Sequence, residues 1–303
     1  MGWIWTLLRQ TYADWSEDRA ARLAAALAYY TTFSIAPLLV VLIALAGFFF
    51  GTEAVRGQLD DQIRGLLGAD AAKAVQDMVQ SASTHESSGI VATAFSLVAL
   101  VLGATGVFGE LQDSLNTIWD VQPKPGRGWR GLVSDRLLSF GMVLAIAFLL
   151  VVSLVVSATI AGIGEYVGGL IGRLEPLWHL LDAVVSIGIL TLLFAGIFKW
   201  LPDVEIAWRD VWIGAAATSV LFTVGKLLLG LYLGRSSTVS VYGAAGSLVV
   251  LLIWVYYSAQ ILFFGAELTQ VYASQHGTRV RPSPHAEPAP EARRPRVQAP
   301  AAT

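Results

Sequence analysis

The stretch AAALAYYTTFSIAPLLVVLIALAGFFF at residues 24–50 contains no Asp, Glu, Lys or Arg. A helix needs about 20 apolar residues to cross the hydrocarbon layer of a membrane, which is roughly 30 Å thick. The stretch is longer than the apolar region of a signal peptide, about 7–15 residues, and a polar segment bearing tryptophans precedes it. It therefore predicts a retained membrane-spanning helix.

Further stretches of the same character predict six spans in all. They lie at about 24–50, 87–118, 137–164, 177–200, 208–234 and 241–272. Because lipid offers the backbone no hydrogen-bond partners, each span is expected to be a helix. The runs are continuously apolar, unlike the alternating pattern of a barrel strand. The expected fold is an all-α membrane protein, a bundle of six transmembrane helices.

The composition favours the same class and excludes several functions. Hydrophobic residues make up 55% of the chain and charged residues 14%, with a mean hydropathy of +0.62, whereas soluble domains carry about 25% charge. The net charge of −2 argues against nucleic-acid binding. Without cysteine, and without an HExxH, GxSxG or P-loop motif, the sequence predicts no catalytic residue, metal site or cofactor, and hence no enzyme.

The distribution of Lys and Arg predicts the orientation. These residues concentrate in the N-terminal segment, in the loops after the second and fourth spans, and in the tail. The remaining loops carry only Arg56, Arg64, Lys73, Arg173 and Arg235. Since cytoplasmic loops are enriched in positive charge, both termini are expected in the cytoplasm of a multi-pass protein of the bacterial inner membrane.

Three segments outside the spans have their own character. Residues 1–22 mix tryptophans with charges and predict an amphipathic interfacial helix. The outward loop 51–86 shows apolar residues at helical spacing, which indicates short amphipathic helices, either a solvated cap or a moving lid. Beyond the membrane domain at 23–272, the Pro/Arg-rich tail 273–303 is expected to be a disordered cytoplasmic segment.

Two charges within spans form a candidate intramembrane polar pair. Lys226 lies ~5 Å and Asp182 ~10 Å beyond the centres of their spans, both in the outward half. Charges in lipid are costly and often functional, so the sequence predicts an Asp182–Lys226 pair or a shared polar cavity. The alternative is that Lys226 extends to the outer headgroups along its aliphatic stem.

A second group of polar residues gathers toward the cytoplasmic ends of the first, second and last spans. This inner-face cluster comprises Tyr29, Tyr30, Ser34, Glu110, Asp113, Asn116, Gln260 and Glu267. Pro37 is expected to kink the first span. Gly103, Gly106 and Gly109 indicate close helix packing. The alternative for the cluster is an ordinary boundary between helix and headgroups.

Three motifs carry a family resemblance: AAALAYYTTFSIAPLL (24–39), GATGVFGELQDSLNTIWDV (103–121) and YGAAGSLVVLLIWVYYSAQILFFGAEL (242–268). From about Trp5 to Tyr272 the sequence resembles the YihY/BrkB family of bacterial inner-membrane proteins, which carries the labels virulence factor and ribonuclease BN. The resemblance implies a six-helix bundle with cytoplasmic ends and a link to lipid or glycolipid movement. The family-typical positions are Tyr29, Pro37, Glu110, Asn116, Trp119, Tyr242, Gly243 and Glu267.

The sequence favours a transporter or a lipid/glycolipid translocase that uses polar groups inside a helical bundle. Its expected partners are membrane lipids and a lipid-like substrate, with no nucleic acid. The alternative is a scaffold that maintains the envelope without transport. A ribonuclease is disfavoured, because phosphodiester cleavage needs clustered metal ligands, and the acidic inner face would repel RNA phosphate. The substrate and the oligomeric state are left open.

Overall fold

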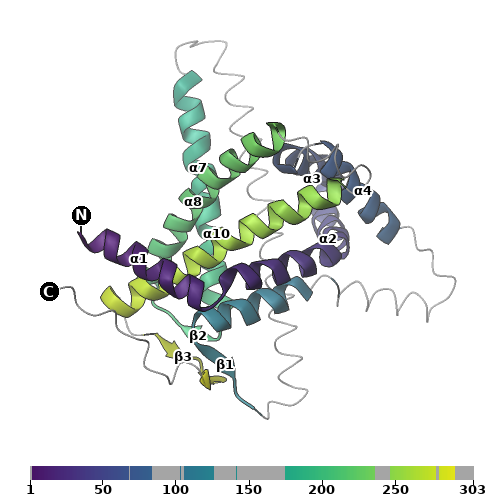
Figure 1. The fold of residues 1–303 in the computed structure, drawn as a ribbon. Helices are drawn as coiled ribbons and strands as arrows, with labels where there is room; N and C mark the ends of the chain where they lie inside the picture. Colours follow the sequence, from purple (N-terminus) through teal and green to yellow (C-terminus); the bar gives the residue numbers. More distant parts are fainter. Residues whose placement is uncertain are drawn as a thin grey trace.

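The structure, a computed structural model, is built almost entirely of helices (Figure 1). It describes residues 2–67, 69–83, 103, 106–125, 141, 175–235, 246–277 and 280–290. The helices are α1 Gly2–Glu17, α2 Ala20–Phe50, α3 Thr52–Leu67, α4 Ala69–Ser83, α7 Glu175–Trp200, α8 Trp208–Arg235 and α10 Gly246–His276. Residues 106–118 are also helical and lead into the strand β1 Val121–Pro123. The class of the fold, an all-α membrane protein, is therefore as the sequence predicts.

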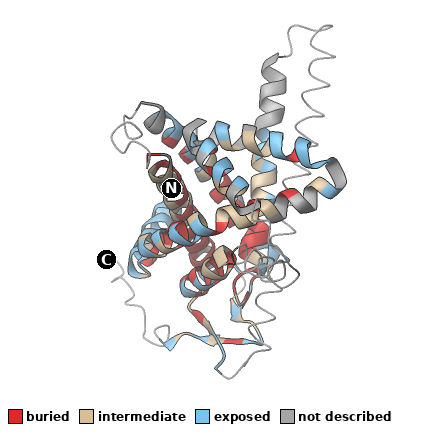
Figure 2. Ribbon diagram, turned by 90° about the vertical axis from the view of Figure 1, so that its right-hand side faces the viewer, coloured by how far each residue is buried: buried red, intermediate tan, exposed pale blue. Residues whose placement is uncertain are grey.

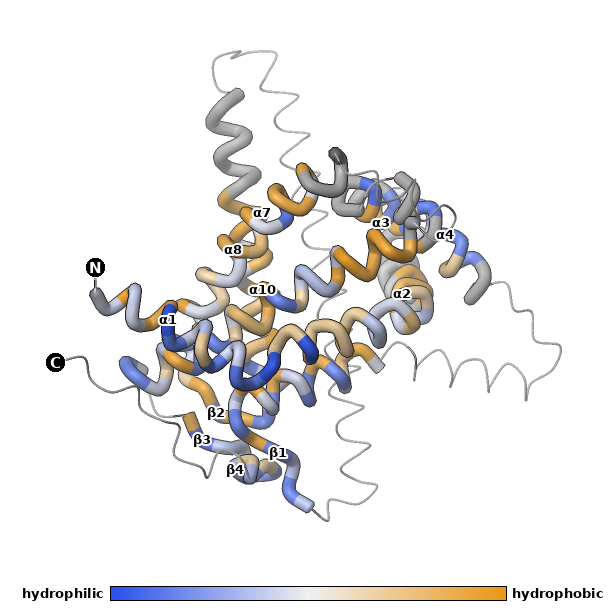
Figure 3. Tube along the Cα trace, viewed as in Figure 1, coloured by the Kyte–Doolittle hydropathy of each residue, from blue (hydrophilic) through white to orange (hydrophobic). Residues whose placement is uncertain are grey.

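Three helices in the described part of the chain are long and apolar enough to cross a membrane. They are Ala20–Val40 in α2, Trp208–Leu231 in α8 and Leu248–His276 in α10, and Val184–Trp200 in α7 is a shorter apolar stretch. Hydrophobic residues run along these helices in Figure 3. The predicted span 87–118 is described as helix only near its end, and the span 137–164 lies outside the described residues apart from Gly141.

A sharp turn separates the N-terminal helix from the first span. Arg19 adopts a left-handed backbone conformation with φ 52°, and α2 begins at the next residue. One face of α1 carries Leu7, Thr11 and Asp14, which are buried at helical spacing. Leu7 packs against Leu268 and Val271 of α10. The turn therefore folds α1 back against the end of the last helix.

The core is shared by α2, the helical residues 106–118, α7, α8 and α10, where α10 packs against α8 and α2 and α7 packs against α8. Figure 2 shows the buried residues gathered inside the bundle. The large, fully buried side chains of the core include Phe198, Leu115 and Phe263. Two Gly-xxx-Thr pairs make the closest approach, Gly214 with Thr218 on α8 and Gly265 with Thr269 on α10. A Cβ at Gly214 would overlap Thr269, and one at Gly265 would overlap Thr218. Each glycine thus forms the hole for the threonine of the other helix.

The glycines of the predicted second span pack closely against α2. A Cβ at Gly103 would lie 2.9 Å from Cγ of Pro37, and one at Gly106 would lie 3.3 Å from Oγ of Ser34. Pro37 lies inside α2, as the sequence predicts. The spacing of Gly103 and Gly106 therefore serves helix packing at the two α2 residues that the sequence singled out.

The two helices α3 and α4 lie at the end of the bundle opposite to α1 and the strands (Figure 1). Gly51 has φ 86°, a conformation that favours glycine, and it turns the chain from α2 into α3. Within the loop 51–86, which the sequence predicts to face outward, α3 and α4 both pack against α2. The apolar side chains Leu59 and Val79 join Ile43 and Val55 there.

Two short antiparallel sheets correct the expectation of a disordered tail. Strand β1 Val121–Pro123 pairs with β4 Ala286–Pro288, and β2 Val204–Glu205 pairs with β3 Arg281–Pro282. Disorder is therefore wrong for 281–288, because the partner strands supply the hydrogen bonds that the tail lacks alone. In addition, α10 continues to His276. Residues 291–303 lie outside the described part.

Candidate functional site

Aromatic side chains mark the end of the bundle that carries α1. Trp200 and Trp208 contact each other edge to face with ring centroids 5.5 Å apart, and Trp212 lies 6.2 Å from Trp208. Nζ of Lys199 donates a hydrogen bond to the carbonyl of Ile206 and lies over the Trp208 ring. All three tryptophans are exposed, as are Trp3, Trp5 and Tyr12 of α1. Because Trp and Tyr favour the headgroup level, this belt indicates a membrane–water boundary.

The helical residues 106–118 present one buried and one outer face at this end. Phe108, Leu111, Leu115 and Ile118 are buried at helical spacing. Glu110 is partly buried, whereas Asp113, one turn later, is exposed. These two carboxylates of the predicted inner-face cluster therefore share the outer face of one helix.

Asn116 joins this helix to the turn after α7. Its Nδ2 donates to Oδ2 of Asp203 at 3.0 Å, and its Oδ1 accepts from the Asp203 backbone N–H at 2.8 Å. One residue past the helix, Trp119 is buried, and Asp120 has a left-handed conformation with φ 56°. Asp120 accepts a hydrogen bond from Nε2 of Gln270 at 3.3 Å. The predicted residue Asn116 thus links the end of its helix to the turn after α7.

The other members of the inner-face cluster do not converge on one point. Tyr29 and Tyr30 are exposed on α2 with their rings edge to face, and Ser34 is buried beside Gly106. Glu267 is fully buried in α10. The structure thus brings the glycines of the predicted second span against Ser34 and Pro37 of α2. It places Glu267 in the core and Gln260 in a separate groove. The functional role of these residues stays a prediction.

The predicted intramembrane pair is described on one side only. Lys226 is exposed on α8, beside the exposed Leu227 and Leu228. Asp182 lies in α7, but its side chain is outside the described part. The pair therefore stays a prediction, while the position of Lys226 on the outer face of α8 suits an extended lysine.

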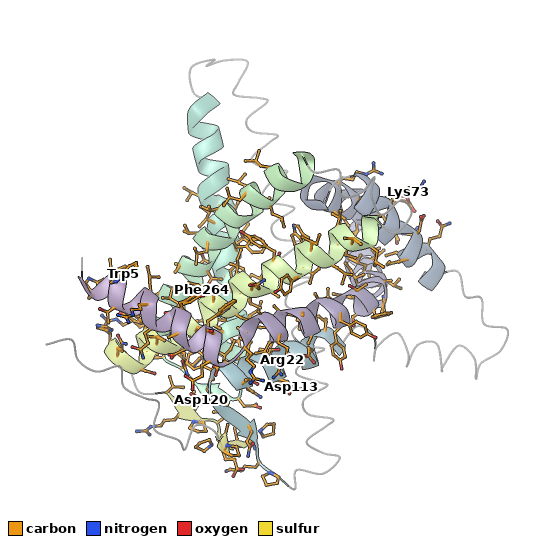
Figure 4. All side chains as sticks on the ribbon, in the orientation of Figure 1. Trp5, Arg22, Lys73, Asp113, Asp120 and Phe264 are labelled. Carbon is orange, nitrogen blue, oxygen red and sulfur yellow. The ribbon has the colours of Figure 1, made fainter. Side chains whose placement is uncertain are left out.

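A lateral groove of about 350 Å³ runs between α1, α8 and α10. Each helix lines it with one face: the lining residues are Leu221, Val224, Gly225 and Leu228 of α8, Tyr257, Gln260, Ile261 and Phe264 of α10, and Tyr12 and Trp15 of α1. At its floor, a Cβ on Gly225 would lie 2.6 Å from Cδ1 of Ile261. Figure 4 shows Phe264 where α10 faces α1. The groove has the size of a small-molecule site, which is roughly 300–1,000 Å³.

Gln260 is the amide group in this apolar lining. Gln260, which the sequence places toward the cytoplasmic end of the last span, lies about 3 Å along the helix from the midpoint of the apolar stretch Leu248–His276. A polar side chain at this depth is costly unless it finds a partner. The groove thus combines a largely apolar wall with the amide of Gln260 and the hydroxyl of Tyr257, which lies beside Gly225.

The structure also reveals residues that the sequence analysis did not single out. Asp203 and Asp120 bind side chains far away in sequence, so no local pattern identifies them. The Gly-xxx-Thr spacing at 214–218 and 265–269 was readable as a packing signal, although the sequence alone does not say which two helices meet.

Comparison with known proteins adds a family. A model of the family described as virulence factor BrkB matches residues 11–290. The chain is similar to UPF0761 membrane proteins of Methylibium petroleiphilum (31% identity over 87% of this chain and 61% of the relative) and Ralstonia nicotianae (28% over 83% and 55%). It is also similar to one from Verminephrobacter eiseniae (29% over 88% and 62%). No solved structure matches.

The matched region includes the C-terminal strands as well as the helices, in accord with their pairing to β1 and β2. The chain spans between 55% and 62% of the length of these three relatives. The family match covers nearly the whole chain, and it includes all three motifs on which the resemblance rests. The chain therefore belongs to the virulence factor BrkB family, the YihY/BrkB family.

Proposed function

We propose that this chain is a multi-pass protein of the bacterial inner membrane that moves a lipid-like amphiphile, a lipid or glycolipid, between leaflets. The proposed topology has six spans with both termini in the cytoplasm. It is supported by the bias of Lys and Arg, and by the aromatic belt beside α1. Its partners are membrane lipids, and the proposal assigns no catalytic step to the chain.

The lateral groove between α1, α8 and α10 is the observation that carries the proposal. At one end the groove is lined by Tyr12 and Trp15 of α1, and along α8 its lining extends from Leu221 to Leu228. An acyl chain suits this apolar wall, because the chain can pack there without leaving a polar group of the protein without a hydrogen bond. Gln260 offers a hydrogen bond to an ester or hydroxyl group that passes the middle of the membrane.

A scaffold that maintains the envelope is the second candidate, and two observations favour it. The contact of α8 with α10 is filled by the two Gly-xxx-Thr pairs, so it leaves no path between these helices at that level. Lys226 is exposed on the outer face of α8 and does not line the groove, so it places no charge along a path for a headgroup. A scaffold would need the apolar helices but not the groove, so the two functions differ in their demand on the groove lining.

The test is lipid movement in proteoliposomes that carry the purified full-length chain. Leu228→Trp fills the groove, and Leu227→Trp is the matched control, because Leu227 is similarly exposed (63% against 58%) but does not line the groove. Transbilayer movement of a fluorescent phospholipid is followed by dithionite quenching. We expect Leu228→Trp to slow movement at least tenfold and Leu227→Trp to leave it within about twofold.

Two outcomes would decide against translocation by this groove. If the wild-type chain moves no lipid above protein-free vesicles, the scaffold is favoured. If the two tryptophan variants slow movement equally, the effect belongs to the lipid-facing surface of α8 in general. Thermal unfolding of both variants in detergent separates a blocked groove from a misfolded protein.

A further inference from the structure

A second cavity, of about 490 Å³, lies at the opposite end of the molecule between α2, α3 and α4. Each of the three helices lines it with two apolar residues one turn apart, so one apolar stripe from each helix faces the same space. These residues are Leu39 and Ile43 of α2, Leu59 and Ile63 of α3, and Val75 and Val79 of α4. The cavity therefore has an apolar wall on three sides.

Polar residues line the same cavity from α3 and α4, again in pairs one turn apart. Arg56 and Asp60 belong to α3, and Gln76 and Gln80 belong to α4. Because α3 begins only after the turn at Gly51, these groups follow the end of the first span, whereas Leu39 lies within that span. The cavity is thus amphipathic: apolar residues line it from all three helices, and its polar residues all belong to α3 and α4.

The charges of this lining leave a cation available. Asp60 accepts a short hydrogen bond of 2.6 Å through Oδ2 from Nε of Arg64, so Arg64 and not Arg56 is its ion-pair partner, while its Oδ1 is buried without a hydrogen bond. Arg56 is 3.8 Å from Glu53, and the side chains of the two are 50% and 91% exposed. Such a long, exposed ion pair contributes little. Arg56 can therefore turn its guanidinium to a bidentate acceptor, and phosphate fits that geometry.

We propose that this cavity binds a phospholipid, with its phosphate at Arg56, its headgroup hydroxyls at the amides of Gln76 and Gln80, and the start of an acyl chain against the apolar stripes. Its assignment to the outer leaflet rests on the topology given under the proposed function. Binding itself needs no transport, so the site can hold a lipid in a scaffold as well as in a translocase.

The test is equilibrium binding of phosphatidylglycerol to the full-length chain in detergent, measured by native mass spectrometry. Diacylglycerol with the same chains lacks the phosphate, and sn-glycerol 3-phosphate lacks the chains. The matched variants are Arg56→Gln and Lys73→Gln, since Lys73 is exposed on α4 but does not line the cavity (Figure 4). We expect Arg56→Gln to weaken phosphatidylglycerol binding about tenfold and Lys73→Gln to change it less than twofold.

The lipid arms complete the test. Diacylglycerol should bind the wild type about as weakly as phosphatidylglycerol binds Arg56→Gln, and glycerol 3-phosphate should not displace the lipid. Displacement by glycerol 3-phosphate would mean a site for soluble phosphate and would overturn the assignment to a lipid. Equal losses in the two glutamine variants would also overturn it, because they would indicate attraction to the surface charge alone. Transport assays with Arg56→Gln report separately on the proposed function.

Discussion

Gly214 and Gly265 show how much of the packing depends on single missing side chains. The threonines that fill the two holes, Thr269 and Thr218, each donate a 2.7 Å hydrogen bond to the carbonyl of the glycine four residues earlier on their own helix. Their hydroxyls are thus satisfied without help from the opposite helix. The contact between α8 and α10 therefore rests on shape, which suits a membrane interior where apolar burial gives helices little reason to associate.

Gly214→Ala should destabilise the chain by about 1–3 kcal/mol, because the new methyl group overlaps Thr269 in a contact that has no room. The measurement is thermal unfolding of the purified protein in detergent. Gly230→Ala on the same helix is the control, since a Cβ there meets no atom within 4 Å. That control should be neutral or stabilising by up to about 1 kcal/mol, the helix propensity gained over glycine. Equal unfolding temperatures would contradict the packing.

At the scale of elements, the strands β3 and β4 connect three parts of the chain. β4 pairs with the strand that follows the helical residues 106–118, and β3 pairs with the strand that follows α7. Side chains strengthen the first sheet, because Nε2 of Gln122 donates to Glu287 at 2.9 Å and Nζ of Lys124 donates to the carbonyl of Pro284. The residues after α10 thereby hold two loops that are distant in sequence.

A chain that ends after Gly277 should lose these contacts, whereas a chain that ends after residue 290 keeps all of them. We expect the shorter chain to be less stable by on the order of 3 kcal/mol, because several hydrogen bonds of ~1 kcal/mol each are lost. The readout is limited trypsin digestion: Lys124 precedes Pro125 and is not cleaved, so the first tryptic site after β1 is Arg127, and cleavage there should become faster only in the shorter chain. Identical digestion of both truncated chains would mean that the strands do not hold the loop.

The sequence predicts these elements unequally, for physical reasons. The runs at 24–50, 177–200, 208–234 and 241–272 overlap α2, α7, α8 and α10, because lipid demands long apolar helices and the demand is visible in composition. The strand pairs were not predictable. They are two or three residues long, their partners are far apart, and the prolines at 282 and 288 read as breakers although they fit short edge strands.

The candidate site follows the same rule. The close packing at Gly103 and Gly106 is predictable because helix contacts leave a local spacing signal, whereas Ser34 and Pro37, which they contact, stand out in the sequence only as a polar residue and a helix breaker. Gln260 stands out in the sequence as a polar residue, but the groove that it lines is visible only once the positions of α1, α8 and α10 are known. The partner of Asn116 was out of reach, because Asp203 lies 87 residues further along the chain. Local sequence patterns therefore predict that a residue makes a packing or hydrogen-bond contact, and only the fold shows which residue is its partner.

At the scale of the whole molecule, α1 and the strands lie at one end and α3 and α4 at the other (Figure 1). The exposed tryptophans lie at the first end, and the cavity with Arg56 lies at the second. A membrane protein with this arrangement presents different chemistry to its two faces. The proposed topology assigns the first end to the cytoplasm.

The absence of native cysteine makes that topology directly testable. Glu17→Cys places a thiol at the end of α1, and Glu53→Cys places one at the opposite end, where the side chain is 91% exposed. In intact spheroplasts, a membrane-impermeant maleimide should label only Glu53→Cys. After the membrane is opened, both variants should be labelled to the same extent. Labelling of Glu17→Cys in intact spheroplasts would reverse the assigned orientation.

The two sheets also have a consequence for biosynthesis. β1 and β2 leave the ribosome long before β3 and β4, which follow the last helix. Neither early strand can find its partner until every apolar segment up to α10 has been made and handed to the membrane. The C-terminal strands can therefore pair with β1 and β2 only after all membrane segments have been inserted. In a chain whose synthesis stops earlier, both loops stay unpaired and accessible to proteases.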